Sequence, residues 1–166
     1  GAFRRFDQYL NANSDDPDAL RGRGFALFRL GRFEEAIVDL QKVVQFEPDR
    51  LGPISEEIAI PGSTQRAQIT YNAASTLAWA HFRLNRAARA EVEFRKVLKA
   101  HPFWADALAG LGYSLLAQND REGAARNFRE ALRISPAYYD ARRGLTLAEV
   151  AGAGPGPQAP GKPGGG

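Results

Sequence analysis

Residues 105–138 read ADALAGLGYSLLAQNDREGAARNFREALRISPAY, and this stretch decides the fold. Its small residues Gly112 and Ala124 stand where two helices can approach closely, and the larger Phe128 follows where it can fill the space between them. Asn119 tolerates the left-handed backbone that ends a helix. Pro136 ends a second helix because proline lacks a backbone N–H. The stretch therefore predicts two helices joined by a tight turn.

The same pattern occurs twice more, in residues 17–50 and 71–104. All three windows are 34 residues long. Matching positions carry matching chemistry: the eighth is Gly24, Ala78 and Gly112, the fifteenth is Gly31, Asn85 and Asn119, the twentieth is Ala36, Ala90 and Ala124, the twenty-fourth is Leu40, Phe94 and Phe128, and the thirty-second is Pro48, Pro102 and Pro136. The sequence thus predicts three consecutive helical hairpins.

The period identifies a known kind of repeat. Its 34 residues resemble the tetratricopeptide repeat, and the third window carries the resemblance best, through Leu108, Leu111, Gly112, Leu115, Ala124, Phe128, Ala131 and Pro136. The first window departs from that pattern at Arg23, where an apolar residue is expected, and the second departs at His81, where Tyr or Leu is usual. The resemblance implies an all-α solenoid of three repeats with a concave groove.

The segments at the two ends fit around these windows. Residues 1–16 keep the register of the second helix of a truncated preceding repeat. Residues 139–151 are expected to form a capping helix that buries Leu145 and Val150. Residues 152–166 consist mainly of Gly and Pro, which is typical of a flexible tail.

Residues 51–70 separate the first window from the second as an insertion. Pro53 and Pro61 break its first part, and Ser63 has the chemistry of an N-cap. We therefore predict a loop followed by an extension of the first helix of the second window, from about Thr64 to Leu84. Insertions in repeat proteins often lie on the binding face, and a tolerated surface loop is the alternative.

Candidate partner-binding residues follow from the resemblance, which implies that the first helix of each repeat lines the groove. The residues placed there are Arg21, Phe25, Phe28, Arg29, Asn72, Trp79, Phe82, Arg83 and Tyr113. Exposed aromatic residues beside arginine have the composition of binding hot spots, and arginine pairs well with carboxylates. The alternative is that these aromatic residues only pack between neighbouring first helices, or lie beneath the insertion.

One well-known ligand of the family is not expected. Family members that hold the C-terminal carboxylate of heat-shock chaperones use Lys and Asn pairs four residues apart. Here Arg21 is followed by Phe25, and Asn72 by Thr76, so that pairing is not reproduced.

The sequence offers little for catalysis, and we expect neither an enzyme nor a cofactor or metal site. There is no Cys or Met, which excludes a thiol nucleophile and a cysteine metal site. His81 stands at a position expected to face the core, and His101 has no His or Cys partner at metal-ligand spacing.

Charge and hydropathy exclude further classes. The net charge is +3, and the most basic stretch, residues 83–99, is interrupted by Glu91 and Glu93. This favours a solvated helix face over nucleic-acid binding. No apolar run reaches the roughly 18 to 20 residues that a membrane-spanning helix needs. The excess of Arg over Lys and the abundant Ala indicate a bacterial source, and the lack of Cys fits either cytoplasm or periplasm.

The sequence thus predicts a non-catalytic scaffold that binds a peptide or partner subunit in the groove. The principal alternative is a structural module that self-associates or oligomerises within a larger bacterial envelope, secretion or glycan-export assembly. An RNA-binding helical repeat is a further alternative, supported only by the charge excess and the basic stretch at residues 83–99.

Overall fold

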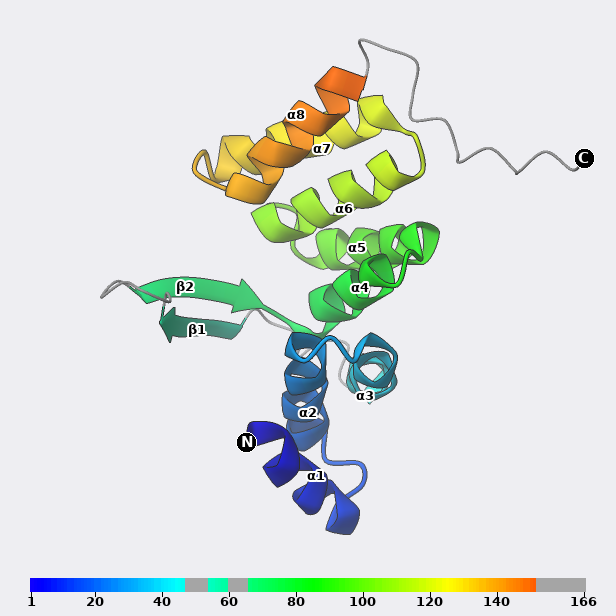
Figure 1. Cartoon of the computed structure of the whole chain (residues 1–166), viewed down its shortest axis with the longest axis vertical. Coiled ribbons are helices and arrows are strands. Elements are labelled where there is room, and N and C mark those ends of the chain that lie inside the picture. The colour runs from blue at the N-terminus through cyan, green and yellow to red at the C-terminus, as the bar shows by residue number, and fades with distance from the viewer. Residues whose placement is uncertain (47–53, 60–65, 152–166) are drawn as a thin grey trace, which may run out of the picture. The chain divides into compact units, whose positions relative to one another are not determined.

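The computed structural model describes residues 1–46, 54–59 and 66–151. The chain divides into two compact units, Gly1–Val97 and Leu98–Gly166. Figure 1 shows the first unit from blue to green and the second from green to orange. The predicted tail at residues 152–166 lies outside the described residues.

Apart from the insertion, consecutive helices joined by short turns follow one another along the chain, as predicted. The first unit contains α1 (Ala2–Ala12), α2 (Pro17–Arg29), α3 (Phe33–Phe46), β1 (Ile54–Ala59), β2 (Arg66–Tyr71), α4 (Ala73–Arg83) and most of α5 (Ala87–Ala100), and the second contains α6 (Ala105–Ala117), α7 (Arg121–Ile134) and α8 (Tyr139–Ala151). Each helix packs on the next within α1 to α4 and again within α6 to α8. Outside the insertion, the all-α helical-repeat architecture is confirmed. The repeat boundaries stay a prediction.

The turns between paired helices confirm the role given to the fifteenth position. Gly31, Asn85 and Asn119 have φ of 77°, 60° and 66°, the left-handed region that ends a helix. Acidic side chains cap the starts of α2 and α7: Asp16 accepts from the Ala19 amide at 3.0 Å, and Asp120 from the Gly123 amide at 2.9 Å.

Small residues meet large ones where the pattern predicted. A Cβ placed on Gly24 would come within 2.7 Å of the Leu40 side chain, and one on Gly112 within 2.7 Å of the Phe128 ring. Phe128 also lies against Gly144 of α8. The residue at the twenty-fourth position of the third repeat therefore fills space against its own repeat and against the following helix, and only the first of these contacts was predicted.

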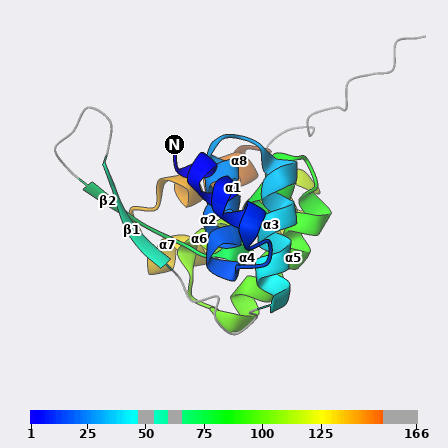
Figure 2. The same cartoon turned by 90° about the horizontal axis from the view of Figure 1, so that it is seen from below.

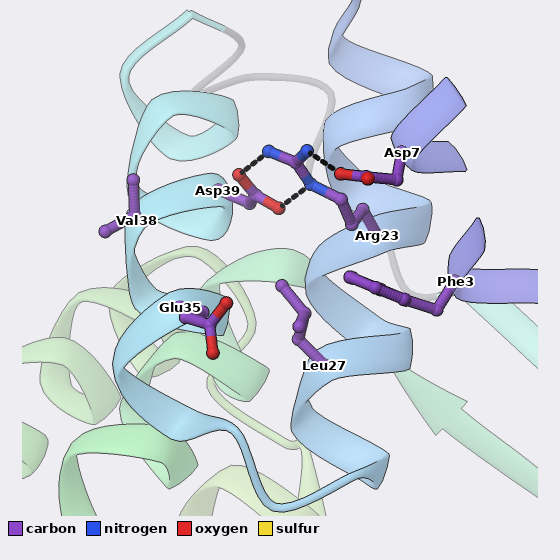
Figure 3. Close-up of a pocket in the computed structure, with 7 residues that line it drawn as sticks. All are labelled: Phe3, Asp7, Arg23, Leu27, Glu35, Val38 and Asp39. Atoms are coloured by element: carbon purple, nitrogen blue, oxygen red, sulfur yellow. Dashed lines mark hydrogen bonds and ion pairs between the residues drawn. The ribbon is translucent and has the colours of Figure 1, made fainter. Parts of the chain in front are cut away.

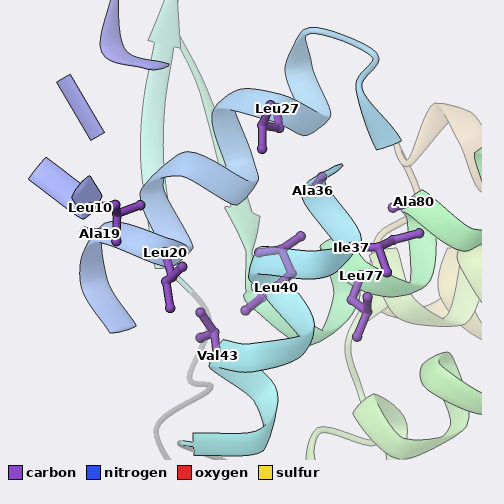
Figure 4. Close-up of a cluster of buried hydrophobic side chains, with 11 residues drawn as sticks. Leu10, Ala19, Leu20, Leu27, Ala36, Ile37, Leu40, Val43, Leu77 and Ala80 are labelled. Carbon is purple, nitrogen blue, oxygen red and sulfur yellow. The ribbon is translucent and has the colours of Figure 1, made fainter. Parts of the chain in front are cut away.

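The core of the first unit is built from one face of each of α1 to α4. Figure 4 shows these apolar side chains facing one another. The buried residues are Leu10, Ala19, Leu20, Leu27, Ala36, Ile37, Leu40, Val43, Ala73, Leu77 and Ala80. This core fixes α2 and α4, the helices that carry most of the predicted binding residues.

The insertion differs from the prediction. β1 and β2 pair antiparallel from Ile54↔Tyr71 to Ala59↔Arg66, and α4 begins only at Ala73. Figure 2 shows the two strands from below. The predicted helix extension is therefore wrong over β2. Two features explain the difference. The β-branched and aromatic residues at the end of this segment favour a strand, which pairs with β1, and Asn72 caps α4 instead of continuing a helix. The cap predicted at Ser63 lies outside the described residues.

The predicted capping helix is present as α8, but the face that it buries is not the predicted face with Leu145 and Val150. Val150 is 68% exposed and Leu145 is only half-buried. The small residues Ala141 and Ala148 are buried instead. Small side chains let α8 pack closely on α6 and α7, and this contact turns Val150 outward.

Candidate functional site

Three helices bring two predicted binding residues together in the first unit. The guanidinium of Arg83, at the end of α4, lies over the ring of Phe33 at 4.9 Å from its centroid. Phe33 begins α3, and its ring meets that of Phe28 on α2 edge-to-face, with centroids 5.3 Å apart. We call these three residues the Phe28–Phe33–Arg83 cluster.

A second aromatic group lies on α4. The rings of Trp79 and Phe82 meet edge-to-face with centroids 5.7 Å apart, and Trp79 contacts the buried Phe94 of α5 at 5.1 Å. Both residues are half-buried. Trp79 therefore supports the core and also reaches the surface.

The predicted binding residues of α2 differ in how far their side chains are exposed. Arg29 is exposed, whereas Phe25 and Phe28 are half-buried and pack against the core of the first unit. The packing alternative therefore describes part of what these aromatic side chains do. Arg21 is half-buried and pairs with Asp18 on its own helix.

Asn72 does not suit a binding role. Its side chain is buried, and Oδ1 accepts from the Ser75 amide at 2.7 Å while the Ser75 hydroxyl accepts from the Asn72 amide at 3.3 Å. This reciprocal capping box starts α4. The placement of Asn72 on the binding face is corrected to a helix-capping role.

Tyr113 lies in the second unit and is held there by local contacts. Its hydroxyl donates to the Asp140 carbonyl at 2.7 Å, and its ring meets Phe128 at 5.0 Å. Burial, and then the Asp140 carboxylate, raise the pKa of Tyr113. The hydrogen bond joins α6 to α8, and the ring contact joins α6 to α7.

Sequence reasoning missed Phe33. It holds the seventeenth position of the first window, where the other windows have Ala87 and Arg121, so no repeat signal marked it. The available signal was its place two residues after the left-handed Gly31, where the second helix starts beside the end of the first.

His81 is buried, as predicted, and within the part of the chain that the structure describes its Nδ1 has no hydrogen-bond partner. Burial lowers the pKa of His81, the Arg89 charge lowers it further, and Glu93 opposes the shift. Among the described residues no three His, Asp or Glu side chains group so as to hold a metal ion. No helix in the same residues is long and apolar enough to cross a membrane.

Comparison with known families settles the kind of repeat. One family model of the tetratricopeptide repeat matches residues 17–50, and a second matches residues 75–139 and 110–151. The chain belongs to the tetratricopeptide repeat family. A search of curated proteins found no match.

Solved structures share this tetratricopeptide repeat fold at low sequence identity. MamA from Desulfovibrio magneticus RS-1 is 18% identical, with a TM-score of 0.73 over 91% of this chain and 74% of that chain. The first such domain of RPAP3 (Spaghetti), bound to the HSP90 peptide SRMEEVD, is 21% identical, with a TM-score of 0.66 over 83% and 94%. The second domain of human RPAP3, in complex with the HSP70 peptide SGPTIEEVD, is 17% identical, with a TM-score of 0.62 over 81% and 98%.

The departure at Arg23 in the first tetratricopeptide repeat has a structural cause. Arg23 donates to both carboxylate oxygens of Asp39, at 2.7 and 2.8 Å, and to Asp7 at 3.0 Å. These groups line a hollow of about 240 Å³ between α1, α2 and α3, shown in Figure 3. None of the predicted binding residues lines it. Glu35 at its rim is paired with Arg32, so its acidic side chains already have cationic partners.

Proposed function

We propose that this tetratricopeptide repeat protein is a non-catalytic interaction module that binds an extended segment of a partner protein. The contact surface we assign is the exposed part of α2 and α4, with the Phe28–Phe33–Arg83 cluster at one end and Trp79 and Phe82 beside it. The segment would carry an apolar side chain for the rings and a carboxylate for Arg83.

The observation that carries this proposal is the position of the Arg83 side chain, exposed and resting on an aromatic ring. Its guanidinium is exposed and lies on the Phe33 ring, and it forms no ion pair with any carboxylate of the described residues. The ring restricts the cation without neutralising it, since a cation–π contact leaves the N–H groups at its edge available. An arginine held in this way favours two-point contact with a carboxylate.

The aromatic residues supply the apolar part of the contact. Phe28 packs against the core, Trp79 packs against the buried Phe94, and the Phe82 ring meets that of Trp79. These contacts restrict the half-buried side chains, so they lose little further freedom when a ligand covers them. Tryptophan and arginine are also enriched among residues that dominate binding energy.

The structural neighbours support peptide binding as a class of function. Two RPAP3 domains of the same fold are bound to chaperone peptides. In this chain Asn72 is buried and caps α4, so a carboxylate would be held by Arg83 and not by an asparagine at the start of that helix. We therefore expect acidic peptides of a different pattern from the chaperone tails.

The proposal is tested with a phage-displayed library of random peptides, panned on the full chain. Enriched peptides are synthesised and their affinities measured by fluorescence anisotropy. Arg83→Glu is expected to weaken binding about tenfold or more, because it replaces an attraction to carboxylate by a repulsion.

The matched control is Arg126→Glu on α7, which reverses an exposed arginine already paired with Glu122. It is expected to leave the affinity unchanged. Equal binding by wild type and Arg83→Glu, or the absence of any enriched acidic peptide, would contradict the proposed surface.

A further inference from the structure

The β-hairpin of the insertion is a sheet of two strands. β1 and β2 form a two-stranded antiparallel sheet, and within the described residues no third strand joins it. The principal contacts of both strands are with each other, whereas the helices pack among themselves. A hairpin of two strands is marginally stable in water unless a third strand or a packed face supports it.

The register of the hairpin divides its residues into two faces. Alternate residues of a strand, and residues directly opposite across the pair, share a face. One face receives Ile54, Glu56, Ile58, Ala67, Ile69 and Tyr71, and the other receives Ser55, Glu57, Ala59, Arg66, Gln68 and Thr70. The first set is apolar except for one glutamate, so the sheet is amphipathic by position.

Each strand also has an outer edge, whose backbone N–H and C=O groups can pair with another strand. The two strands differ in which residues stand opposite each other when a second copy of the same strand pairs with the outer edge in antiparallel orientation. Two copies of β1 aligned near their centres, with matching faces, place Glu56 opposite Glu56 or Glu57 opposite Glu57. Like charges directly opposite each other oppose pairing.

β2 has no such obstacle. With Ile69 opposite Ile69 of a second copy, Ala67 stands opposite Tyr71 and Gln68 opposite Thr70. Directly opposite residues then come from the same face, so the apolar face continues across the contact. A pair of β-branched residues, flanked on both sides by an alanine–tyrosine pair, is a favourable cross-strand arrangement.

We propose that β2 is a self-association edge: two copies of the chain pair antiparallel along β2, about a two-fold axis at Ile69, to form one sheet in the order β1–β2–β2–β1. The sheet then has four strands, enough for independent stability. The two-fold arrangement is closed, because each copy uses the same edge. The proposed contact uses the backbone edge of β2 and none of the residues assigned to peptide binding, so the inference goes beyond the peptide-binding function and can fail without it.

The first test traps the contact with a single cysteine, since the native chain has none. Opposite Cα atoms in an antiparallel pair are roughly 4.5 to 5.5 Å apart, within the range of a disulfide. Ile69→Cys is therefore expected to give a cross-linked dimer rapidly under copper phenanthroline and dissolved oxygen.

The matched control is Glu56→Cys, because Glu56 pairs with Ile69 across the hairpin and lies on the same row of the sheet. In the proposed dimer it lies three strand spacings, about 14 Å, from Glu56 of the second copy. Cross-linking of Ile69→Cys is expected to be at least about tenfold faster than that of Glu56→Cys. Equal rates would overturn the proposal.

The second test uses charge at the two-fold axis and needs no cross-link. Ile69→Lys and Ile69→Glu each place like charges opposite each other, and both are expected to be monomeric by sedimentation velocity where the wild type forms dimers. Their equimolar mixture places lysine opposite glutamate and is expected to restore the dimer. Unchanged helical circular dichroism shows that the helices remain folded. A mixture that stays monomeric, or a wild type that is monomeric at every concentration, would overturn the proposal.

Discussion

Arg23 and Asp39 are joined by two parallel hydrogen bonds, and the Asp39 carboxylate is buried beneath them. The pair stands where the other repeats have different chemistry: Leu77 and Leu111 replace the arginine, and Glu93 and Asn127 replace the aspartate. A buried carboxylate requires a partner, because removing one member of a buried pair leaves an uncompensated charge. The arginine and the aspartate of the first repeat therefore depend on each other.

Arg23→Leu is expected to destabilise the first unit by about 3 to 5 kcal/mol, because it strands the Asp39 charge. The double variant Arg23→Leu/Asp39→Asn reproduces the third repeat, where Asn127 donates to the Gly123 carbonyl at 2.8 Å. It is expected to recover most of that loss. Urea unfolding followed by circular dichroism measures both. A double variant no more stable than Arg23→Leu would contradict this dependence.

The helix-ending turns give a prediction with a built-in control. Gly31 has φ of 77°, and the same position is asparagine in the other two repeats. Gly31→Ala is expected to cost about 1 to 2 kcal/mol, because a left-handed backbone strains an ordinary side chain. Gly31→Asn is expected to cost clearly less. Thermal unfolding of the two variants side by side checks the order, and equal losses would count against the turn as the cause.

The sequence predicted features that repeat and missed those that occur once. The left-handed turns and the contacts of Gly24 and Gly112 recur at fixed spacing, so three windows support each inference. Phe33 has no equivalent in the other repeats. Its role depends on the end of α4, which is distant in sequence.

The insertion shows the same limit. The local pattern predicts that the first helix of the second repeat begins before Arg66 and includes Arg66–Tyr71. This segment instead pairs with Ile54–Ala59, and that pairing decides its conformation. The repeat position of Asn72 predicts a place on the binding face. Because β2 ends just before it, Asn72 instead stands at the start of α4 and caps that helix. In both cases a contact outside the repeat pattern overrides the local pattern.

His81 makes stability depend on pH. Burial lowers the pKa of its imidazole below the ordinary 6.5, so the unfolded chain takes up the proton first as the pH falls. The contribution of neutral His81 to the free energy of unfolding is complete above about pH 6.5 and is lost progressively as the pH falls below it. We expect the free energy of unfolding to fall between pH 7 and pH 5.

His81→Leu is expected to flatten this dependence, since Leu27 and Leu115 hold the same position in the other repeats. It is also expected to add on the order of 1 kcal/mol at pH 7, because it removes from the interior a buried Nδ1 that has no hydrogen-bond partner among the described residues. Urea unfolding at a series of pH values measures both effects. An equal slope in wild type and His81→Leu would assign the pH dependence to other groups.

Phe33 is expected to act on ligand affinity through Arg83. Phe33→Leu keeps an apolar side chain at the start of α3 but removes the ring beneath the guanidinium, 4.9 Å away. The loss of this cation–π contact is expected to weaken binding of a selected acidic peptide about two- to fivefold. Phe33→Tyr keeps the ring and is expected to retain the affinity. Because Phe33 also packs against the core, thermal unfolding is measured for both variants. Equal affinities for wild type, Phe33→Leu and Phe33→Tyr would show that Arg83 needs no such support to bind a carboxylate.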